Sequence, residues 1–343
     1  MISGWKAATA AAVALATASL GALSTGPAQA DATQLRFAVF TPDREQTFLT
    51  VMQPFAEAVN AALPGVVQIE LFPNGALGRN PVQQAQMVLD GVADIAWTVA
   101  SYTPGRFHEN EVFELPGLFA DMSEGTLVFT RLVQDGKIAG YEEFVPIGTF
   151  TTAPYSIHTN GTVRSLDDLS GRMIRSASAI EGETLGRFGA VPIGMPVTEV
   201  AEAISRRTID GTTLHPSPLF DFGVERVTTT HYFMPLGLVP LAILMNRARF
   251  DALPAQAQEV ILAHSGMWTA ERFNEHIGAY NASLVERLDA DARHEVLYPT
   301  DEELARMQVI YDEVIAAWAA ASPRNAELLE IVRAEIAAVR AGN

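Results

Sequence analysis

Hydrophobic and polar positions along the chain follow two periodicities in turn, one typical of helices and one typical of strands. Apolar side chains recur at helical spacing over 48–62, and Pro64 and Gly65 end that pattern. The next run, V-V-Q-I-E-L, alternates residue by residue, as in a strand with one buried face. Strand and helix patterns continue to alternate as far as residue 246, and helical patterns fill most of the remainder. This order predicts an α/β fold with a mostly parallel sheet covered by helices on both faces.

The individual elements can be placed approximately from the same pattern. Strands are predicted at 34–40, 66–71, 94–100, 145–150, 153–159, 172–175, 191–195, 208–214 and 239–246. Helices are predicted at 48–62, 81–89, 124–134, 181–188, 199–205 and 254–290, and in the last forty residues. Thr300 and Glu303 have the spacing of a capping box, which predicts a helix that begins there.

The first thirty residues form a segment unlike the rest of the chain. Lys6 precedes an apolar run over 7–23, and Ala28 and Ala30 provide the small residues of a cleavage site. We expect residues 1–30 to be a signal peptide that is cut after Ala30, so that the mature protein resides in the periplasm. A membrane anchor is the alternative, but this run is rich in alanine and is followed by a suitable cleavage site.

The rest of the chain has no cysteine and no second apolar run of about 18 residues. We therefore expect no disulfide bonds and no membrane-spanning segment, and stability must come from a buried core. The formal net charge is -17, and loss of Lys6 with the leader makes it -18. Such an acidic protein is a poor partner for nucleic acid or anionic lipid. An anionic ligand would have to be attracted by a few well-placed cations.

Motifs of common enzymes and metal sites are missing from the sequence. It contains no G-x-S-x-G, H-E-x-x-H, Walker or G-x-G-x-x-G motif, and its seven histidines show no metal-ligand spacing. We therefore expect no cofactor, no metal and no catalytic residues. An enzymatic alternative remains, in which Glu181 and Glu183 act as a carboxylate pair.

Residues 167–175, D-D-L-S-G-R-M-I-R, end an apolar run on Arg175. A guanidinium stays charged in proteins and is costly to bury without an anion beside it. Arg175 therefore either lies on the surface or meets a negative group. Trp97 and Tyr102 flank the carboxyl end of another predicted strand, where open α/β sheets bind ligands. Core packing is an equally good explanation for Trp97.

Several segments in order resemble a known family. They are D-L-S-G-R-M-I-R, L-G-R-F-G-A-V-P-I-G-M-P-V-T-E-V-A-E-A-I, T-I-D-G and L-M-N-R-A-R-F-D-A-L-P-A-Q-A-Q-E-V-I, preceded by G-A-L-G, D-G-V-A-D-I-A and Y-T-P-G-R-F. Together they cover most of the chain after the leader. The sequence resembles the solute-binding subunits of tripartite ATP-independent periplasmic (TRAP) transporters, the DctP-like family.

This resemblance implies a two-lobed periplasmic binding protein fold with a hinge and a long helix that spans both lobes. We expect lobe I to comprise 31–152 plus about 240–280, and lobe II 153–239 plus about 281–343, with crossings near Thr152 and Val239. The implied function is to capture an organic acid and deliver it to membrane permease subunits, without ATP. A sensor subunit of the same fold that serves a receptor kinase is the alternative.

The resemblance also assigns a role to Arg175, because the arginine of the family's G-x-x-x-R motif pairs with the solute carboxylate. Members that bind sialic acid have a second arginine about twenty residues earlier, where this chain has Tyr155. They also have an asparagine where this chain has Leu214 or His215. Both differences favour a less polar acid, apolar or aromatic in its body. The expected ligand-binding residues are Arg175, Tyr155, Trp97, Phe40, Leu214 and His215.

Overall fold

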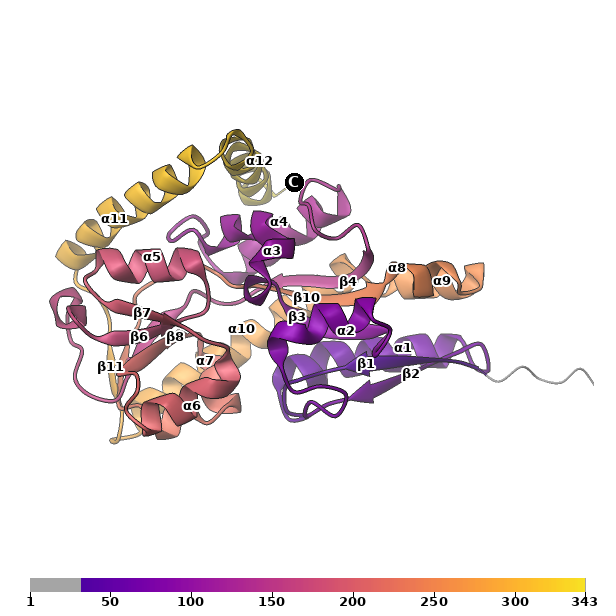
Figure 1. The fold of residues 1–343 in the computed structure, drawn as a ribbon, viewed down its shortest axis with the longest axis horizontal. Helices are drawn as coiled ribbons and strands as arrows, with labels where there is room; N and C mark the ends of the chain where they lie inside the picture. Colours follow the sequence, from indigo (N-terminus) through magenta and orange to yellow (C-terminus); the bar gives the residue numbers. More distant parts are fainter. Residues whose placement is uncertain (1–31, 343) are drawn as a thin grey trace, which may run out of the picture. The chain divides into compact units, whose positions relative to one another are not determined.

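The computed structural model describes residues 32–342, which contain two β-sheets surrounded by helices (Figure 1). The predicted signal peptide lies outside the described residues. The α/β, two-lobed architecture expected from the sequence is confirmed, with one sheet in each lobe. The exact division of the whole chain into lobes stays a prediction.

The first sheet has the strand order β2-β1-β3-β10-β4. Strands β1 and β2 pair in parallel, as do β1 and β3, whereas β10 runs antiparallel to β3 and β4. The sheet is therefore mixed, because β10 enters it from the opposite end after the chain returns from the second sheet. Its strands are β1 (Thr33–Ala38), β2 (Val67–Phe72), β3 (Ile95–Val99), β4 (Phe144–Thr151) and β10 (Pro240–Asn246).

The second sheet has the order β11-β9-β5-β8-β6-β7. Strand β6 pairs in parallel with β7 and β8, while β5 is antiparallel to both of its neighbours. The chain passes between the sheets after β4, again after β9, and a third time between β10 and β11. The strands are β5 (Ser156–Thr159), β6 (Met173–Ser176), β7 (Val191–Gly194), β8 (Gly211–Leu214), β9 (Thr230–Tyr232) and β11 (Glu295–Leu297).

Helices cover both sheets, and the central strands of the first sheet are buried along nearly their whole length. The short helical turns are η1 (Phe48–Met52), η2 (Pro81–Gln83), η3 (Ala100–Tyr102), η4 (His108–Glu114), η5 (Leu166–Leu169) and η6 (Val224–Arg226). The shorter α-helices are α1 (Gln53–Ala62), α2 (Gln84–Leu89), α3 (Pro104–Phe107), α5 (Ala179–Arg187), α6 (Val197–Ser205), α7 (Pro216–Asp221), α8 (Arg247–Asp251) and α9 (Ala255–Ala263). The longer ones are α4 (Met122–Gln134), α10 (Met267–Ala290), α11 (Asp301–Ala320) and α12 (Pro323–Arg340).

Helix α10 is the long helix that contacts both lobes. It packs on β4 and α4 beside the first sheet, and on α7 and β11 beside the second. The predicted helix over 254–290 is interrupted, because Gly266 (φ 60, ψ -118) separates α9 from α10. Only glycine adopts this backbone conformation without strain.

The C-terminal helices also connect the lobes. Helix α11 packs on α5, and α12 packs on α4 (Figure 1). The capping box of Thr300 and Glu303 is present at the start of α11, which confirms that prediction. Ser165 and Asp168 form a second capping box at η5.

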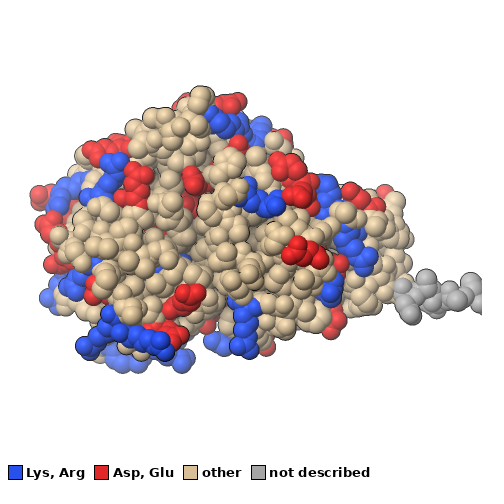
Figure 2. Space-filling model, in the orientation of Figure 1, with Lys and Arg blue, Asp and Glu red and all other residues tan. Residues whose placement is uncertain are grey.

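The surface shown in Figure 2 carries acidic and basic side chains mostly interspersed around its periphery, with a largely uncharged centre. Within residues 32–342, no helix combines the length and apolar character needed to cross a bilayer. In the same residues, no three His, Asp or Glu side chains gather into a potential metal-binding group.

Candidate ligand-binding site

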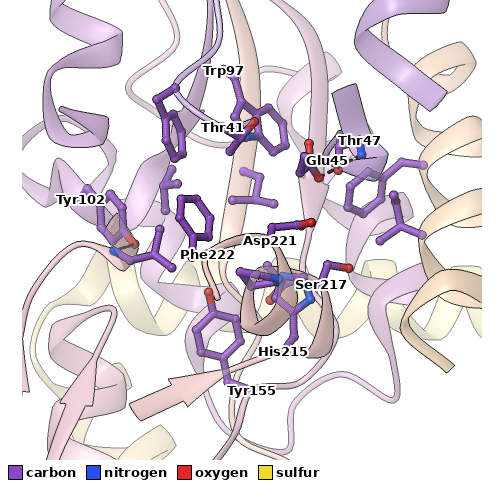
Figure 3. Close-up of a pocket in the computed structure, with 18 residues that line it drawn as sticks. Thr41, Glu45, Thr47, Trp97, Tyr102, Tyr155, His215, Ser217, Asp221 and Phe222 are labelled. Carbon is purple, nitrogen blue, oxygen red and sulfur yellow. Dashed lines mark hydrogen bonds between the residues drawn. The ribbon is translucent and has the colours of Figure 1, made fainter. Parts of the chain in front are cut away.

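A cavity lies where segments attached to the two sheets meet (Figure 3), and it contains about 570 Å³ of empty space including its open side. Half of its lining residues are apolar: Phe40, Val99, Trp97, Val197, Pro218, Phe222, Leu241, Phe273 and Ile277. The other half carry polar atoms: Thr41, Glu45, Thr47, Tyr102, Thr152, Tyr155, His215, Ser217 and Asp221. No Lys or Arg belongs to this lining set.

The fold places these residues together because several strands end at the cavity. Phe40 and Thr41 follow β1, Tyr102 follows β3, and His215 follows β8. These positions lie beyond the carboxyl ends of strands, where open α/β sheets commonly bind ligands. Helix α10 supplies the side chain of Phe273 from behind.

Trp97 and Phe273, two aromatic residues of the cavity lining, both pack on the buried ring of Phe150. Phe150 is fully buried and packs on Trp97 with a centroid distance of 5.8 Å. Phe150 also stacks on Phe273 at 4.5 Å, with 26° between the ring planes. Trp97 thus packs against the core and forms part of the cavity wall, so the two explanations considered for it are compatible.

Arg175 lies next to the cavity but is not part of its lining. Its side chain is fully buried, and three of its nitrogens donate hydrogen bonds inside the protein. Nε donates to Met195 O at 2.8 Å, Nη1 to Thr213 O at 3.0 Å, and Nη2 to the hydroxyl of Tyr102 at 2.9 Å. A guanidinium has five N–H groups, so these three bonds leave one further N–H on Nη1 and one on Nη2. Tyr102, which accepts one of these bonds, lines the cavity.

A buried carboxyl group accompanies the buried guanidinium. Glu181 is 6% exposed and accepts a hydrogen bond from the backbone N–H of Ala177. Burial raises the pKa of Glu181, and the charge of Arg175 opposes that rise. Burial would lower the pKa of Arg175, but Tyr102, Tyr155 and Glu181 outweigh this effect and raise it.

The carboxylates of the enzymatic alternative do not converge. Glu181 points into the protein, whereas Glu183 is solvent-facing and forms an ion pair of 2.8 Å with Arg187. Glu181 and Glu183 are two residues apart on helix α5, and their side chains therefore lie on different faces of the helix.

Tyr155 presents its hydroxyl to the cavity, as Figure 3 shows. Its ring lies 5.7 Å from the ring of His215. Burial raises the pKa of Tyr155 well above its ordinary value, so the phenol keeps its proton. It can therefore donate a hydrogen bond to an anion in the cavity.

His215 is neutral and presents an acceptor. Asn281 Oδ1 accepts hydrogen bonds from Ser217 N at 3.0 Å and Ser217 Oγ at 2.6 Å, and lies 3.4 Å from His215 Nδ1. This network assigns the ring proton to Nδ1 and leaves Nε2 as an acceptor. Burial lowers the pKa of His215 to about 3.

Leu214 lies outside the cavity wall, in contrast to its expected place among the binding residues. Its side chain is fully buried in the hydrophobic core, and its carbonyl lies 3.1 Å from His158 Nε2. Strand β8 ends at Leu214, and the following residue, His215, is the one that reaches the cavity.

Two acidic residues in the lining were not expected from the sequence. Glu45 accepts hydrogen bonds from the N–H groups of Thr47 and Phe48, both at 2.9 Å. Burial raises the pKa of Glu45. Burial and, next, the charge of Glu45 raise the pKa of Asp221 to about 8, while Arg44 acts in the opposite direction.

Four of the six expected binding residues therefore share the cavity: Phe40, Trp97, Tyr155 and His215. Arg175 is hydrogen-bonded to Tyr102 of the lining but is not itself part of it, and Leu214 is in the core. Glu45 was missed because an acid in T-P-D-R-E-Q resembles an ordinary residue of a helix's first turn. Asp221 belongs to a short helix that the hydrophobic pattern does not reveal.

Comparison with known proteins agrees with this architecture. The model of the DctP family, described as bacterial extracellular solute-binding protein, family 7, matches residues 37–321. The C4-dicarboxylate-binding periplasmic protein DctP of Rhodobacter capsulatus is 28% identical over 293 residues, which cover 78% of this chain and 85% of that protein.

Solved structures show the same fold. A TRAP solute-binding protein from a marine metagenome, specific for aromatic acid ligands and crystallised with 3-hydroxybenzoate, matches with a TM-score of 0.83 and 28% identity. The match covers 90% of this chain and 98% of that one. A TRAP solute-binding protein from Rhodoferax ferrireducens, with copurified benzoate, has a TM-score of 0.81 at 24% identity and covers 89% and 98% of the two chains. This protein belongs to family 7 of the bacterial extracellular solute-binding proteins, the DctP family of TRAP transporter subunits.

Proposed function

We propose that this protein captures a small monocarboxylate with an apolar or aromatic body and delivers it to the membrane permease subunits of a TRAP transporter. One observation carries the choice of ligand. The cavity combines aromatic walls with two acidic side chains, and its lining includes no Lys or Arg.

The body of the ligand would lie against the aromatic wall. Phe40, Trp97, Phe222 and Phe273 supply large apolar surfaces to the cavity. Burial of an aromatic ring against such surfaces contributes about 25 cal/mol for each Å² of apolar area removed from water. Offset or tilted ring contacts add about 0.5–1.5 kcal/mol.

The carboxylate would bind at the side of the cavity formed by Tyr102 and Tyr155. Tyr155 offers a hydroxyl that keeps its proton, and Arg175 retains one N–H on each terminal nitrogen beyond Tyr102. We propose that the carboxylate accepts hydrogen bonds from both residues, with Tyr102 shifting to give access to the guanidinium. Charge-assisted bonds from arginine are the stronger kind, so Arg175 would be the anchor.

A dicarboxylate fits this cavity poorly. Its second carboxylate would be buried on the side of Glu45 and Asp221, where no lining cation can balance its charge. A charge buried without a partner is strongly unfavourable. The aromatic-acid specificity of the marine metagenome protein is therefore a better guide to this ligand than the C4-dicarboxylate named for the Rhodobacter protein.

We further propose that the protein is exported and cut after Ala30, and that it binds its solute without transforming it. Residues 31–152 with about 240–280, and 153–239 with about 281–343, would act as two lobes that close over the ligand. Arg44 Nη2, beside the first sheet, donates to Asp221 O at 3.0 Å in helix α7 beside the second, which is the kind of contact that closure makes.

Native mass spectrometry of freshly purified protein, followed by a thermal-shift screen, tests this function. A ligand at about 100 times its dissociation constant adds roughly 2.7 kcal/mol to the stability of the folded state. We expect benzoates and phenylacetates to stabilise the protein, and succinate and sialic acid to have little effect. Stabilisation by dicarboxylates or sugar acids alone would contradict the proposed ligand class.

A further inference from the structure

Glu114 is a buried acid that does not line the ligand cavity. It ends the turn η4, which packs on β10 beside the first sheet and on α5 beside the second. Its side chain is 4% exposed. Oε1 accepts a hydrogen bond from Ser101 Oγ, whereas Oε2 has no hydrogen-bond partner within residues 32–342. The carboxyl group of Glu114 therefore lies between the two lobes with one oxygen unsatisfied.

The surroundings of Glu114 disfavour a negative charge. Burial is the main cause that raises its pKa to about 8, and the charges of Glu181 and Glu111 add to the rise. Ser101 and Ser178 act in the opposite direction by hydrogen bonding. A buried carboxylate without a cation beside it takes up a proton, because the neutral acid costs less to bury.

The cations on the elements that pack on η4 are all engaged elsewhere. The ion pairs of α3, α5 and α12 are Arg106–Glu143, Arg187–Glu183, Arg324–Glu109, Arg333–Glu330 and Arg340–Glu124. Strand β10 has no charged residue, and η3 adds only the phenol of Tyr102 as a titratable group. On η4 itself, the charge of His108 acts on Glu109, and Glu111 accepts a 3.0 Å hydrogen bond from an indole N–H. These elements therefore leave no cation to balance an ionised Glu114.

Glu114 also lies at the hinge. Its backbone carbonyl leaves no room for a side chain on Gly237, in the segment by which the chain returns to the first sheet. Next to it is a crevice whose walls include Ser101 from η3 and Ser178 from the start of α5. Because these two walls belong to different lobes, opening of the hinge would widen the crevice and admit water to the carboxyl group.

The proposed carboxylate site is close enough to affect Glu114. The charges of Glu181 and Glu114 both act on Tyr155, whose hydroxyl faces the cavity. Glu181 also acts on Arg175. A ligand carboxylate at Tyr155 and Arg175 would add negative charge to this cluster, which has a single guanidinium. Closure and ligand binding therefore both favour the neutral form of Glu114.

We infer that the protein takes up a proton when it closes on its acid, and that Glu114 holds this proton between the lobes. The inference rests on the proposed function and adds to it a dependence of capture on pH. In the open protein, Glu114 meets water and ionises as an ordinary carboxyl group. The proton comes from the solvent on closure and returns to it when the lobes open.

The direction of the pH dependence follows from linkage. The closed state holds a proton that the open state has released, so the affinity falls as the pH rises. The window extends from the ordinary pKa of 4.5 to about 8. Within it the loss of affinity approaches about tenfold for each pH unit, and between pH 7 and pH 8 it is about fivefold.

Calorimetric titration with benzoate at pH 7, in phosphate and in Tris, counts the protons taken up. The two heats differ by the number of protons multiplied by the difference in ionisation enthalpy of the buffers. Benzoate stays ionised at this pH, because carboxylic acids ordinarily titrate near pH 4, so the ligand adds no proton of its own. The affinity is then measured at pH 7 and pH 8.

The proteins compared are the wild type, Glu114→Gln, Glu183→Gln and Asp221→Asn, each shown to be folded by circular dichroism. Glu183 is the matched control, because it is an exposed acid that lines the same crevice and pairs with Arg187. Asp221 lines the cavity and is another acid whose pKa is raised to about 8, so its variant separates its contribution from that of Glu114.

We expect the wild type to take up about 0.5–1 proton for each benzoate bound, and its affinity to fall about fivefold between pH 7 and pH 8. Glu114→Gln should take up at least about 0.5 proton fewer and should bind at least as tightly as the wild type at pH 8. Glu183→Gln should behave as the wild type does. A merely structural role for Glu114 would lower the affinity at both pH values and leave the proton count unchanged.

Failure of the inference is distinguishable from failure of the proposed function. If the wild type binds benzoate without proton uptake, the inference is wrong and the proposed function stands; this result requires no variant to fold. Uptake that Glu114→Gln keeps and Asp221→Asn loses would assign the proton to Asp221 and would equally refute the inference. If no benzoate binds at either pH, the proposed function fails and the inference fails with it.

Discussion

Tyr102 and Arg175 meet between the two sheets, with the hydroxyl of Tyr102 accepting a 2.9 Å hydrogen bond from Arg175 Nη2. Tyr102 follows strand β3 of the first sheet, and Arg175 belongs to strand β6 of the second. The same hydroxyl accepts a 3.0 Å bond from the N–H of Val197 at the start of helix α6. This hydrogen bond joins the two lobes beside the cavity. A ligand carboxylate that reaches Arg175 would therefore either replace the bond to Tyr102 or add to it.

Replacement of Arg175 should abolish most of the binding. We expect Arg175→Ala to lose about 3–5 kcal/mol of binding free energy, or roughly two to three and a half decades of affinity. Arg175→Lys should recover only a small part, because lysine lacks the planar fork that grips both oxygens. Arg172→Ala, three residues earlier and only partly buried, is the control and should change little.

Replacement of Arg175 should also lower the stability of the folded protein. Arg175 is fully buried and donates hydrogen bonds to Met195 O and Thr213 O. Arg175→Ala should therefore also lose stability, and binding must be measured by calorimetry on protein shown to be folded by circular dichroism. A folded Arg175→Ala or Arg175→Lys protein that binds within a few-fold of wild type would show that Arg175 is not the anchor.

Asp221→Asn should stabilise the ligand-free protein more at pH 8 than at pH 5. The pKa of Asp221 rises from 3.8 to about 8 on folding, so between these values the folded state holds a proton that the unfolded state has released. The stability contributed by this group is thus lost as the pH rises through that window. Asparagine does not titrate, so the Asp221→Asn protein does not lose this stability as the pH rises.

Urea unfolding of both proteins at the two pH values measures this difference, and Glu199→Gln, at an exposed acid in the first turn of helix α6, is the control. An Asp221→Asn effect of the same size at pH 5 and pH 8 would mean that the carboxyl group titrates normally in the folded protein.

Three buried or partly buried histidines form a chain that predicts a loss of stability in acid. His158 Nδ1 lies 2.8 Å from His231 Nδ1, and His231 Nε2 lies 2.9 Å from His294 Nδ1. Burial lowers the pKa of His158 from 6.5 to about 4 and that of His231 to about 2. Between pH 6.5 and 4 the unfolded state binds more protons at these sites, so their contribution to stability falls as the pH falls.

His158→Gln should therefore cost stability at pH 7, because a hydrogen bond to His231 is disturbed, but the difference from wild type should shrink as the pH falls from 6.5 to 4. Urea unfolding across that range measures it, with His276→Gln, outside the histidine chain, as the control. A difference that grows toward pH 4 would contradict the assigned protonation states.

Gly266→Ala should destabilise the protein by about 1–3 kcal/mol. The backbone of Gly266 has φ 60 and ψ -118, and an added Cβ would lie 2.1 Å from Gln134 Nε2. Gly186→Ala in helix α5, where an added Cβ meets nothing within 4 Å, should instead gain about 0.5–1 kcal/mol. Chemical denaturation measures both, and equal effects would show that the break between α9 and α10 carries no backbone strain.

Much of the fold follows from local patterns in the sequence. The long elements, such as β10 and α4, have enough residues to display a period of two or of 3.6. Strands β9 and β11 have three residues each and show no period, so they were not predicted. The break at Gly266 was missed because glycine within a helical pattern is often tolerated.

The site was harder to predict than the fold. Arg175 was proposed from the resemblance to a family motif, and Trp97 and Tyr102 were singled out because they flank the carboxyl end of a predicted strand. Thr41 and Asp221 come from segments far apart in the chain that meet only after both sheets have formed. Nothing in the local sequence of either residue indicates that its side chain lines a cavity.

The central claim is that the cavity binds an aromatic monocarboxylate through its charge and its apolar body. Calorimetric titration of the wild-type protein with 3-hydroxybenzoate, 3-hydroxybenzamide and succinate tests it most directly. We expect clear binding of the benzoate, binding of the neutral amide at least about a hundredfold weaker, and no measurable binding of succinate. Tight binding of succinate together with no binding of the benzoate would contradict it.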